Sequence, residues 1–361
     1  MKKLKIKNYF PGGNTSQGFY SFYQYIPFHC DRVYIIKGGP GTGKSTTMKN
    51  IGKAALKKGY EIEYHWCSSD NDSIDGVVIP AKKVAIFDGT APHMIDPENP
   101  GAVEDIINVG EFWDSKLLIN NRNHIINLNQ SIADKFDKTY SYLKVAKNLH
   151  QEWEKYYQKG FNQDQANLTE KNLIEKILPK NSNLTNSGFR RHLFGSAITP
   201  EGQVNYFDNL TSNMKKRYLI KGKPEIKKSK MIHKIGKTVL HHGYNVIFLH
   251  CAFNPDQIDA IIIPQLKLAV IDDSEPHQVK ETKQDEVIDI MNTVNSNIIS
   301  EYSANIKETK INFKNFMDKA INSLHQAKEI HDKLEQFYIK AMDFDRLETE
   351  EKKLIEKILN R

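Results

Sequence analysis

The sequence predicts an α/β fold built as two tandem domains, each a mostly parallel sheet flanked by helices and followed by a long helical extension. Three observations lead to this prediction. A strand, a glycine-rich loop and a helix follow one another within residues 32–56, much of the first half of the 361-residue chain recurs in the second half, and both halves end in stretches with helical periodicity. We place the domains at residues 1–182 and 183–361.

Composition limits the class of protein. A hydrophobic content of 39% and a charged content of 26% fit a globular chain, and a net charge of +7 weakly favours an anionic partner such as nucleic acid. The three cysteines, Cys30, Cys67 and Cys251, form no disulfide framework and predict a reducing cytoplasm. No run of 18 apolar residues occurs, and no apolar segment follows the first lysines, so we expect neither a membrane span nor a signal peptide.

The glycine-rich loop of the first half carries the strongest functional signal. It follows the β-branched and aromatic run Val33–Ile36, precedes the helix-compatible segment Thr46–Leu56, and fits the pattern G-x-x-x-x-G-K-[ST] with Gly38, Gly39, Pro40, Gly41, Thr42, Gly43, Lys44 and Ser45. Glycines let successive backbone N–H groups converge on phosphate oxygens, and a helix N-terminus adds unpaired donors. Lys44 can reach the β- and γ-phosphates, and the Ser45 hydroxyl can ligate Mg²⁺. Residues 38–46 are therefore the predicted nucleotide site.

This loop resembles the Walker A motif of the P-loop NTPase superfamily, whose members bind ATP or GTP with Mg²⁺. The loop sequence GGPGTGKST is most similar to the loops of ATPases and small kinases. The whole chain resembles a bacterial family of tandem-duplicated P-loop ATPase-like proteins, through the stretches FPGGNTSQGFYSFY, GGPGTGKST and IFDGTAPH. The resemblance implies tandem P-loop NTPase domains and ATP binding, and it names no substrate.

An acidic residue provides a second functional signal. Asp88 directly follows the apolar segment Lys83–Phe87, which is predicted to be a strand. An acidic residue at the tip of a buried strand resembles Walker B and would hold Mg²⁺, whereas the alternative is a turn cap. Lys44 and Asp88 are the predicted catalytic residues, and Ser45 and Asp88 are the predicted metal ligands. Gly89 stands where many ATPases of the additional-strand type have a water-orienting glutamate. This leaves slow hydrolysis, a base from elsewhere, or phosphoryl transfer to a substrate.

Residues of the first half recur 184 positions later in the second half, so that Lys37-Gly38 pairs with Lys221-Gly222. Towards the ends of the two halves the spacing becomes 181 positions, and Leu173–Leu178 then pairs with Leu354–Leu359. The polar, turn-rich stretch Pro179–Ser187 is the predicted joint. Two matching halves of this size predict two similar domains that pack as a pseudo-dimer. Tyr60–Trp66 and Val77–Ile79 are the further strands expected in the first half.

The second copy departs from the first at its loop, Gly222–Ser229. Glu225 replaces Gly41, and Lys227 replaces Gly43, so a negative charge and a long side chain oppose phosphate binding although Lys228 and Ser229 remain. The second domain is therefore predicted to be degenerate. It also lacks the run Gly12–Asn14, which suggests that this loop of the first copy serves the nucleotide.

The helical extensions carry an apolar stripe at 3.6-residue spacing, repeated at an offset of 181: in the first copy it comprises Ile132, Phe136, Tyr140, Leu143, Ala146, Leu149, Trp153 and Tyr156. The stripe predicts the core-facing side of a long helix or helical hairpin, and an arm that binds a protein or nucleic acid is the alternative. A basic cluster could bind phosphate, nucleic acid or an acidic partner, or form a solvated face; its members are Lys215, Lys216, Arg217, Lys221, Lys223, Lys227, Lys228 and Lys230.

Together these features favour an ATP-binding protein that acts through the first loop as a Mg²⁺-dependent ATPase or an ATP-driven switch. One alternative is a small-molecule or nucleotide kinase, which would need an acceptor pocket and an arginine-rich lid that the first copy does not display. The other is a non-catalytic nucleotide-binding adaptor whose helical arms engage a partner. Arg190 or Arg191, at the start of the second copy, could supply an arginine finger to the first site.

Overall fold

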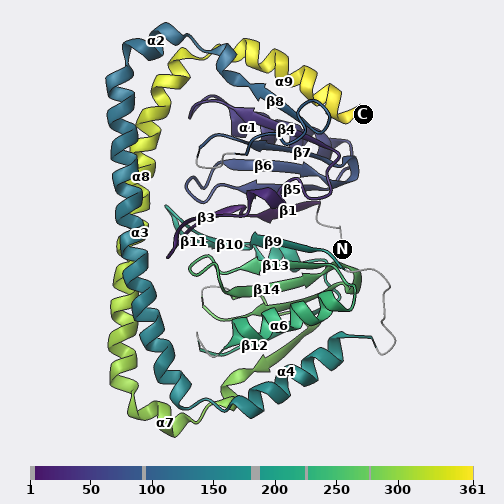
Figure 1. Cartoon of the computed structure of the whole chain (residues 1–361), viewed down its shortest axis with the longest axis vertical. Helices are drawn as coiled ribbons and strands as arrows, with labels where there is room; N and C mark the ends of the chain where they lie inside the picture. Colours follow the sequence, from purple (N-terminus) through teal and green to yellow (C-terminus); the bar gives the residue numbers. More distant parts are fainter. Residues whose placement is uncertain (1–4, 92–94, 180–187, 224–226, 276–277, 361) are drawn as a thin grey trace.

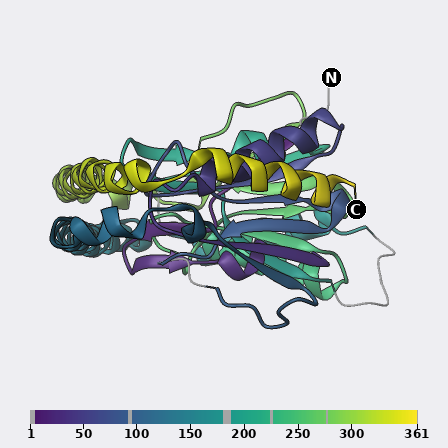
Figure 2. The ribbon, with the colours of Figure 1, turned by 90° about the horizontal axis from the view of Figure 1, so that it is seen from above.

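The computed structural model describes residues 5–91, 95–179, 188–223, 227–275 and 278–360. Two six-stranded sheets lie one beyond the other along the longest axis, and two long helices run beside both of them (Figure 1). Seen from above, the two helices lie to one side of the strands and do not cover the faces of the sheets (Figure 2). The predicted fold class, two α/β units with long helical extensions, is confirmed.

The first sheet has the strand order β1-β5-β6-β7-β4-β8, with β1 Ile6–Tyr9, β5 Ile62–Trp66, β6 Ile74–Ile79, β7 Val84–Asp88, β4 Arg32–Lys37 and β8 Glu104–Asn108. Among these strands β6 pairs antiparallel with both neighbours, and the other pairs are parallel. The strands expected from the sequence all form. Helix α1, Lys44–Lys57, follows the glycine-rich loop, and β2 Gly12–Thr15 pairs with β3 Gly18–Ser21 in a separate hairpin.

The second sheet repeats this order from the opposite direction, β16-β12-β15-β14-β13-β9. Its elements are β9 Arg190–Phe194, β10 Ser196–Thr199, β11 Gly202–Asn205, α5 Phe207–Thr211, β12 Lys216–Lys221, α6 Lys228–His241, β13 Val246–His250, β14 Ile258–Ile263, β15 Leu268–Asp272 and β16 Asp285–Asp289. Short 3-10 turns complete the two halves at Tyr23–Tyr25, Pro80–Lys82, Val109–Phe112, Pro264–Leu266 and Ile290–Thr293.

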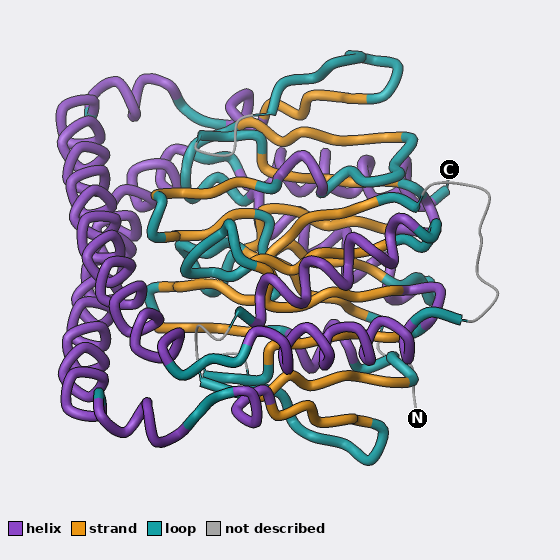
Figure 3. The backbone as a smooth tube through the Cα atoms, turned by 60° about the horizontal axis from the view of Figure 1, so that its bottom comes forward, coloured by secondary structure: helices purple, strands orange, loops and turns teal. Residues whose placement is uncertain are grey.

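The helical extensions are α2 Ser115–Asn120, α3 Arg122–Lys159 and α4 Gln163–Ile177 in the first half, and α7 Ser296–Glu301, α8 Ser303–Ala341 and α9 Phe344–Leu359 in the second. Helices α3 and α8 run antiparallel and pack on each other along one side of both sheets (Figure 3). Leu143 and Ala146 of the predicted stripe are fully buried against Ala320 and Leu324. The stripe therefore faces a core, and its partner is the equivalent helix of the other half.

The terminal helices are exchanged between the halves. Helix α4 packs on α6 of the second half, whereas α9 packs on α1 of the first. The core beneath the first sheet accordingly includes Leu347, Ile358 and Leu359 together with Met48 and Ile51. The predicted domain boundary at residue 182 lies outside the described residues, and the division stays a prediction. Helices from each side of it nevertheless complete the core of the opposite sheet.

The two sheets meet at a seam between β1 and β9. Phe10 and Phe194, which are equivalent in the repeat, exchange reciprocal backbone hydrogen bonds of 3.0 Å, as expected for a pseudo-two-fold axis. Beside them the Arg191 guanidinium donates to a Glu63 carboxylate oxygen at 2.8 Å and to the backbone oxygen of Tyr25, and both charged side chains are buried. Burial alone would raise the pKa of Glu63, but the charge of Arg191 and smaller contributions from its neighbours hold that pKa well below its usual range.

Much of the predicted basic cluster is engaged within the chain. Arg217 is buried and pairs with Asp285 and Asp208, Lys216 pairs with Glu286, and Lys221 pairs with Glu281. Arg217, which is buried, therefore belongs neither to a solvated face nor to an open binding surface. In the part of the chain that the structure describes, no helix is long and apolar enough to cross a membrane.

The seam leads to a stability prediction. Arg191→Met leaves the Glu63 carboxylate buried without its ionic partner, so we expect the free energy of unfolding to fall by about 3–5 kcal/mol, measured by urea-induced unfolding. Because the folded-state pKa of Glu63 lies below its unfolded value, the stabilisation from this pair is complete above about pH 4.3 and decreases as the pH falls below it.

The adjacent Arg190 is exposed, which makes Arg190→Met the matched control. Its effect should stay within about 0.5 kcal/mol of the parent. Equal destabilisation by the two substitutions would contradict the assignment of the buried pair to the seam.

Candidate functional site

The glycine-rich loop between β4 and α1 has the backbone that its sequence predicts. Gly41 and Gly43 have φ values of +68° and +88°, a region that residues with a Cβ rarely adopt. Gly43 is the N-cap of α1 and brings no side-chain cap, so the first N–H groups of the helix depend on another partner. The Lys44 ammonium donates to the backbone oxygens of Gly38 at 3.1 Å and Gly39 at 2.6 Å.

The predicted acidic residue stands beside this loop. Strands β4 and β7 are direct parallel neighbours, with Ile36 opposite Asp88, so their carboxyl ends meet at one edge of the sheet. The Lys44 ammonium lies 3.5 Å from an Asp88 carboxylate oxygen, and the other oxygen accepts the N–H of Thr90 at 2.8 Å. Ser45 is also held here, because its hydroxyl oxygen accepts the N–H of Ile74 at 3.0 Å. The structure thus brings together all three residues predicted for catalysis and metal binding.

A cavity of about 940 Å³ opens above this group. Its floor is the loop from Pro40 to Thr46, and further walls come from residues 67–75, from Asp88 to Ala91, and from helices α3 and α8. A volume of this size suits a small-molecule or cofactor site. Since α8 belongs to the second half of the chain, both halves build the cavity.

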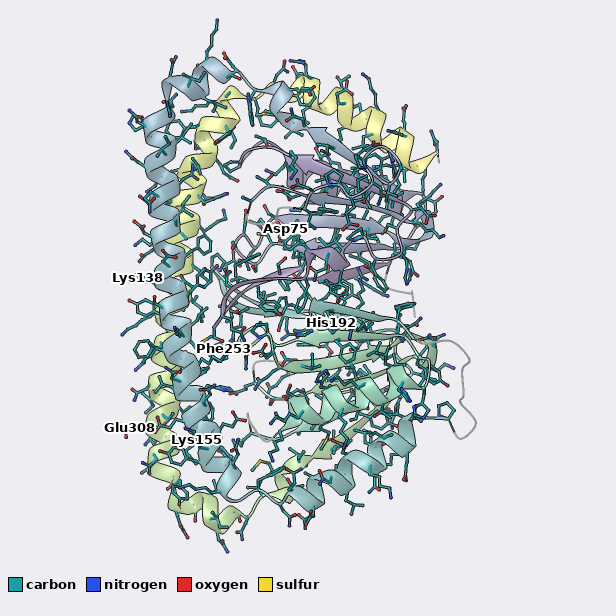
Figure 4. All side chains as sticks on the ribbon, viewed as in Figure 1. Asp75, Lys138, Lys155, His192, Phe253 and Glu308 are labelled. Atoms are coloured by element: carbon teal, nitrogen blue, oxygen red, sulfur yellow. The ribbon has the colours of Figure 1, made fainter. Side chains whose placement is uncertain are left out.

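Asp75 is a cavity residue that the sequence reasoning did not select. It lies at the start of β6, at the end of the first sheet that faces the helix pair (Figure 4), and it is only 5% exposed. The Tyr23 hydroxyl donates to its carboxylate at 2.5 Å; burial, and next the charge of Asp75, raise the pKa of Tyr23 well above its usual value. Gly76 pairs with Phe87 in the antiparallel β6–β7 register, so Asp75 and Asp88 lie one residue beyond that pair at the same edge of the sheet, and both line the cavity. The sequence feature that could have identified Asp75 is the recurrence of Ile74-Asp75 as Ile258-Asp259 in the second half.

The loop glycines also serve a close approach of the exchanged helices. A Cβ on Gly39 would overlap the ring of Tyr338, and one on Gly41 would lie 3.0 Å from Glu335. A Cβ on Gly43 would lie 2.9 Å from Leu347 of α9. The absence of side chains therefore allows both a phosphate and the second half of the chain to contact this loop.

The charges around the cavity are mixed. Among the described lining residues, carboxylates outnumber ammonium groups by five to three: Asp70, Asp72, Asp75, Asp88 and Glu335 against Lys44, Lys49 and Lys328. Such a site disfavours a bare polyphosphate and favours one that carries a divalent cation. Hydroxyl and carboxylate oxygens such as those of Ser45 and Asp88 are the ligands that Mg²⁺ prefers. The residues present therefore fit a nucleotide with Mg²⁺.

The corresponding loop of the second half is arranged differently. Lys227 occupies the position of Gly43 with φ of +42°, and its ammonium contacts Gln163 and the ring of Phe161 on the α4 side. The Lys228 ammonium donates to an Asp272 carboxylate oxygen at 2.7 Å and to the Ser274 hydroxyl at 2.6 Å. Glu225 lies outside the described residues. The cation equivalent to Lys44 is thus held by side chains of its own half.

Aromatic side chains of the second half stand at positions equivalent to cavity-lining residues of the first half. The ring of His150 lies 5.5 Å from those of Phe253 and Phe313 and 6.2 Å from that of Trp153. The repeat assigns smaller residues to the same positions in the first half. Phe253, Phe313 and Trp153 correspond to three residues that line the open cavity: Ser69, Ile132 and Leu334.

Two residues that the sequence singled out, Arg191 and Asn14, are not among the described lining residues of the cavity. Arg191 was considered as an arginine finger, but it is buried in the seam with Glu63 and cannot serve the site; neither it nor Arg190 is among the described lining residues. Asn14 is fully buried, and its amide donates to the backbone oxygens of Ser68 and Ile198. Its side-chain oxygen accepts the hydroxyl of Tyr140, so Asn14 supports a residue of the cavity wall.

Residues 28–160 match the family model of Novel STAND NTPase 3 (nSTAND3). The first half is similar to an NTPase family. The matched segment contains the glycine-rich loop, Asp88 and all of α3, so it includes the loop side of the cavity and one of its two helical walls. Neither a curated protein nor a solved structure matches the chain. The similarity supports nucleotide binding by an NTPase in general.

The contact between the loop and α9 can be tested with Gly43→Ala. We expect the positive φ to cost about 1–2 kcal/mol, and the contact with Leu347 to add about 1–3 kcal/mol, measured as a loss in the free energy of unfolding.

Gly59→Ala is the matched control, because Gly59 follows the same helix with φ of +92° and a Cβ there would meet only the Lys5 ammonium at 3.8 Å. It should show the backbone cost alone. If the two variants lost the same stability, the close approach of α9 to the loop would be wrong.

Proposed function

We propose that the first half binds ATP with Mg²⁺ through Gly38–Thr46 and acts as an ATPase or an ATP-driven switch. The observation that carries this proposal is the difference between two equivalent places in one chain. Beside the intact loop a cavity of about 940 Å³ is open, whereas beside the degenerate loop three aromatic side chains surround His150. A chain that kept both loops only for packing would have no need for this difference.

In this proposal each residue has a separate task. The uncapped N–H groups at the start of α1 bind phosphate oxygens, and Lys44 exchanges its contacts with the backbone oxygens of Gly38 and Gly39 for the β- and γ-phosphates. Ser45 and Asp88 hold Mg²⁺, which would neutralise phosphate charge. Asp75 is a buried carboxylate that lines the same cavity as Asp88, and it is our candidate to orient the attacking water, because Gly89 stands where many ATPases have a glutamate.

The competing functions make different demands. The main support for the adaptor alternative is Gly89, which stands where many ATPases have a glutamate. Its helical arms would have to engage a partner through other faces, because the contact between α3 and α8 uses the apolar faces of both. A kinase would place an acceptor where the hydrolase places water. Protein or nucleic-acid partners stay predictions, and the three free cysteines are consistent with the reducing cytoplasm that we propose as the location.

Lys44→Ala tests the proposal directly. Because it removes a charge-assisted contact to phosphate, ATP affinity should fall about 10- to 100-fold, and Mg²⁺-dependent phosphate release should be lost. The measurements are calorimetric titration with ATP and release of inorganic phosphate, each with Mg²⁺ and again with a chelator.

Lys228→Ala is the matched control, because Lys228 is the equivalent residue of the second half and is already paired with Asp272. It should leave both readings at the parent level. Binding without phosphate release would favour the switch or the kinase, and a parent protein that bound no ATP would contradict the proposal.

A second prediction transfers the aromatic cluster to the open site. The double substitution Ser69→Phe and Leu334→Trp places the side chains of Phe253 and Trp153 at their equivalent positions in the cavity wall. We expect a folded protein with ATP binding reduced by at least about tenfold, a loss of about 1.4 kcal/mol. The reciprocal change, Phe253→Ser with Trp153→Leu, should leave ATP binding unchanged. Undiminished binding by the first variant would separate the cavity from nucleotide binding.

A further inference from the structure

One face of helix α8 carries polar residues that the apolar stripe does not explain. Lys328, His331 and Glu335 line the cavity, and Tyr338 follows three residues later against Gly39 of the loop. Their spacing of three, four and three residues places them on one side of a helix. The same residue types recur at the offset of 181 in α3: Lys147, His150, Glu154 and Tyr157. Neighbouring outer positions differ, as Asp332 does from Gln151.

The exchange of helices gives this face a different environment in each half. In the first half it lies across the open cavity from the intact loop, whereas in the second His150 contacts the rings of Phe253 and Phe313. The polar face at the nucleotide site therefore comes from the other copy. Lys328 is the member that could respond to phosphate charge, because it is a cation.

Lys328 lies on the cavity wall opposite the loop of residues 67–75. It forms ion pairs with Asp332 on its own helix and with Asp70, from which it is separated by 3.7 Å. Asp70 belongs to the loop that leads to Ile74, whose N–H donates to Ser45, the predicted Mg²⁺ ligand. Burial lowers the pKa of Lys328, but the hydrogen bond to Asp332 and the charges of Asp70, Asp332 and Glu335 outweigh this and raise it, so the side chain is charged at neutral pH.

Other cations of the site have tasks of their own. Lys44 belongs to the loop itself, and Lys49 contacts the backbone oxygen of Asp72 and stands over the ring of Trp66. The described lining residues include no arginine, and Arg191 is held in the seam. Among these residues Lys328 is the cation that a new anionic partner could recruit from a carboxylate.

We propose that Lys328, carried by a helix of the second half, binds the γ-phosphate of a nucleoside triphosphate held by the loop of the first half. This rests on the proposed function and adds how the site distinguishes a triphosphate from a diphosphate. When the γ-phosphate is present, the ammonium turns from Asp70 to it. With a diphosphate the ion pair between Lys328 and Asp70 persists.

The test compares ATP with ADP within each variant. Calorimetric titrations with Mg²⁺ are made on the full chain of the parent, Lys328→Gln, Lys328→Arg and the matched control Lys147→Gln. Lys328→Gln should lose about 10- to 100-fold in affinity for ATP and keep the parent affinity for ADP. Lys328→Arg, which keeps the cation, should retain the preference for ATP, and Lys147→Gln should match the parent. The ratio of the two affinities does not depend on the fraction of protein that is folded.

The outcomes separate this inference from the proposal beneath it. A parent that binds neither nucleotide contradicts the proposed function, and the inference fails with it. A parent that binds both, with the same ratio of affinities in Lys328→Gln, contradicts the inference alone. An equal change in Lys147→Gln would also overturn it, because that residue serves the other half.

Discussion

The antiparallel contact between α3 and α8 is the constraint on which the rest of the structure depends. The helices have 38 and 39 residues, which corresponds to a length of about 57 Å. Each begins beside its own sheet and ends beside the other one (Figure 1). The chain that follows must therefore dock on the opposite half, and this is why α4 packs on α6 and α9 packs on α1.

This exchange makes the candidate site a composite of both halves. The loop, Ser45 and Asp88 come from the first half, whereas Lys328 and Glu335 come from the second. The direct contacts of Tyr338 and Leu347 with the loop glycines mean that a change at the loop acts on α8 and α9 as well. The other end of α8 lies beside the second sheet, so this helix contacts both halves of the chain (Figure 1).

The local parts of this arrangement could be predicted from the sequence. The strand at Val33–Ile36, the loop that follows and the strand ending in Asp88 depend on short-range patterns and on backbone freedom at glycine, which neighbouring residues reveal. The exchange of α4 and α9 depends instead on contacts between segments far apart in the chain. The role of Arg191 could not be predicted for the same reason. Its charge suggested an arginine finger, but its ionic partner, Glu63, lies on a strand far from it in the sequence.

The α8 face illustrates a signal that was present and was set aside. The repeat of the apolar stripe is informative because packing preserves apolar character, whereas charged residues on a helix usually form a solvated face. Lys328 and Glu335 of α8 nevertheless correspond to residues of the same types in α3, Lys147 and Glu154, and all four side chains are half-buried. Solvation does not require a particular residue at an exposed position, so retention of charged types at half-buried positions indicates a contact.

The degenerate half has a physical reason to persist. Its own loop holds Lys228 against Asp272, and aromatic rings stand at positions equivalent to cavity-lining residues of the first half, so the two loops have different surroundings. It supplies α9, whose Leu347, Ile358 and Leu359 are buried in the first core at about 1.5–3 kcal/mol each, and it supplies the α8 wall of the cavity. Loss of the second half would uncover the core and open the site together. Its loop could therefore diverge while its helices could not.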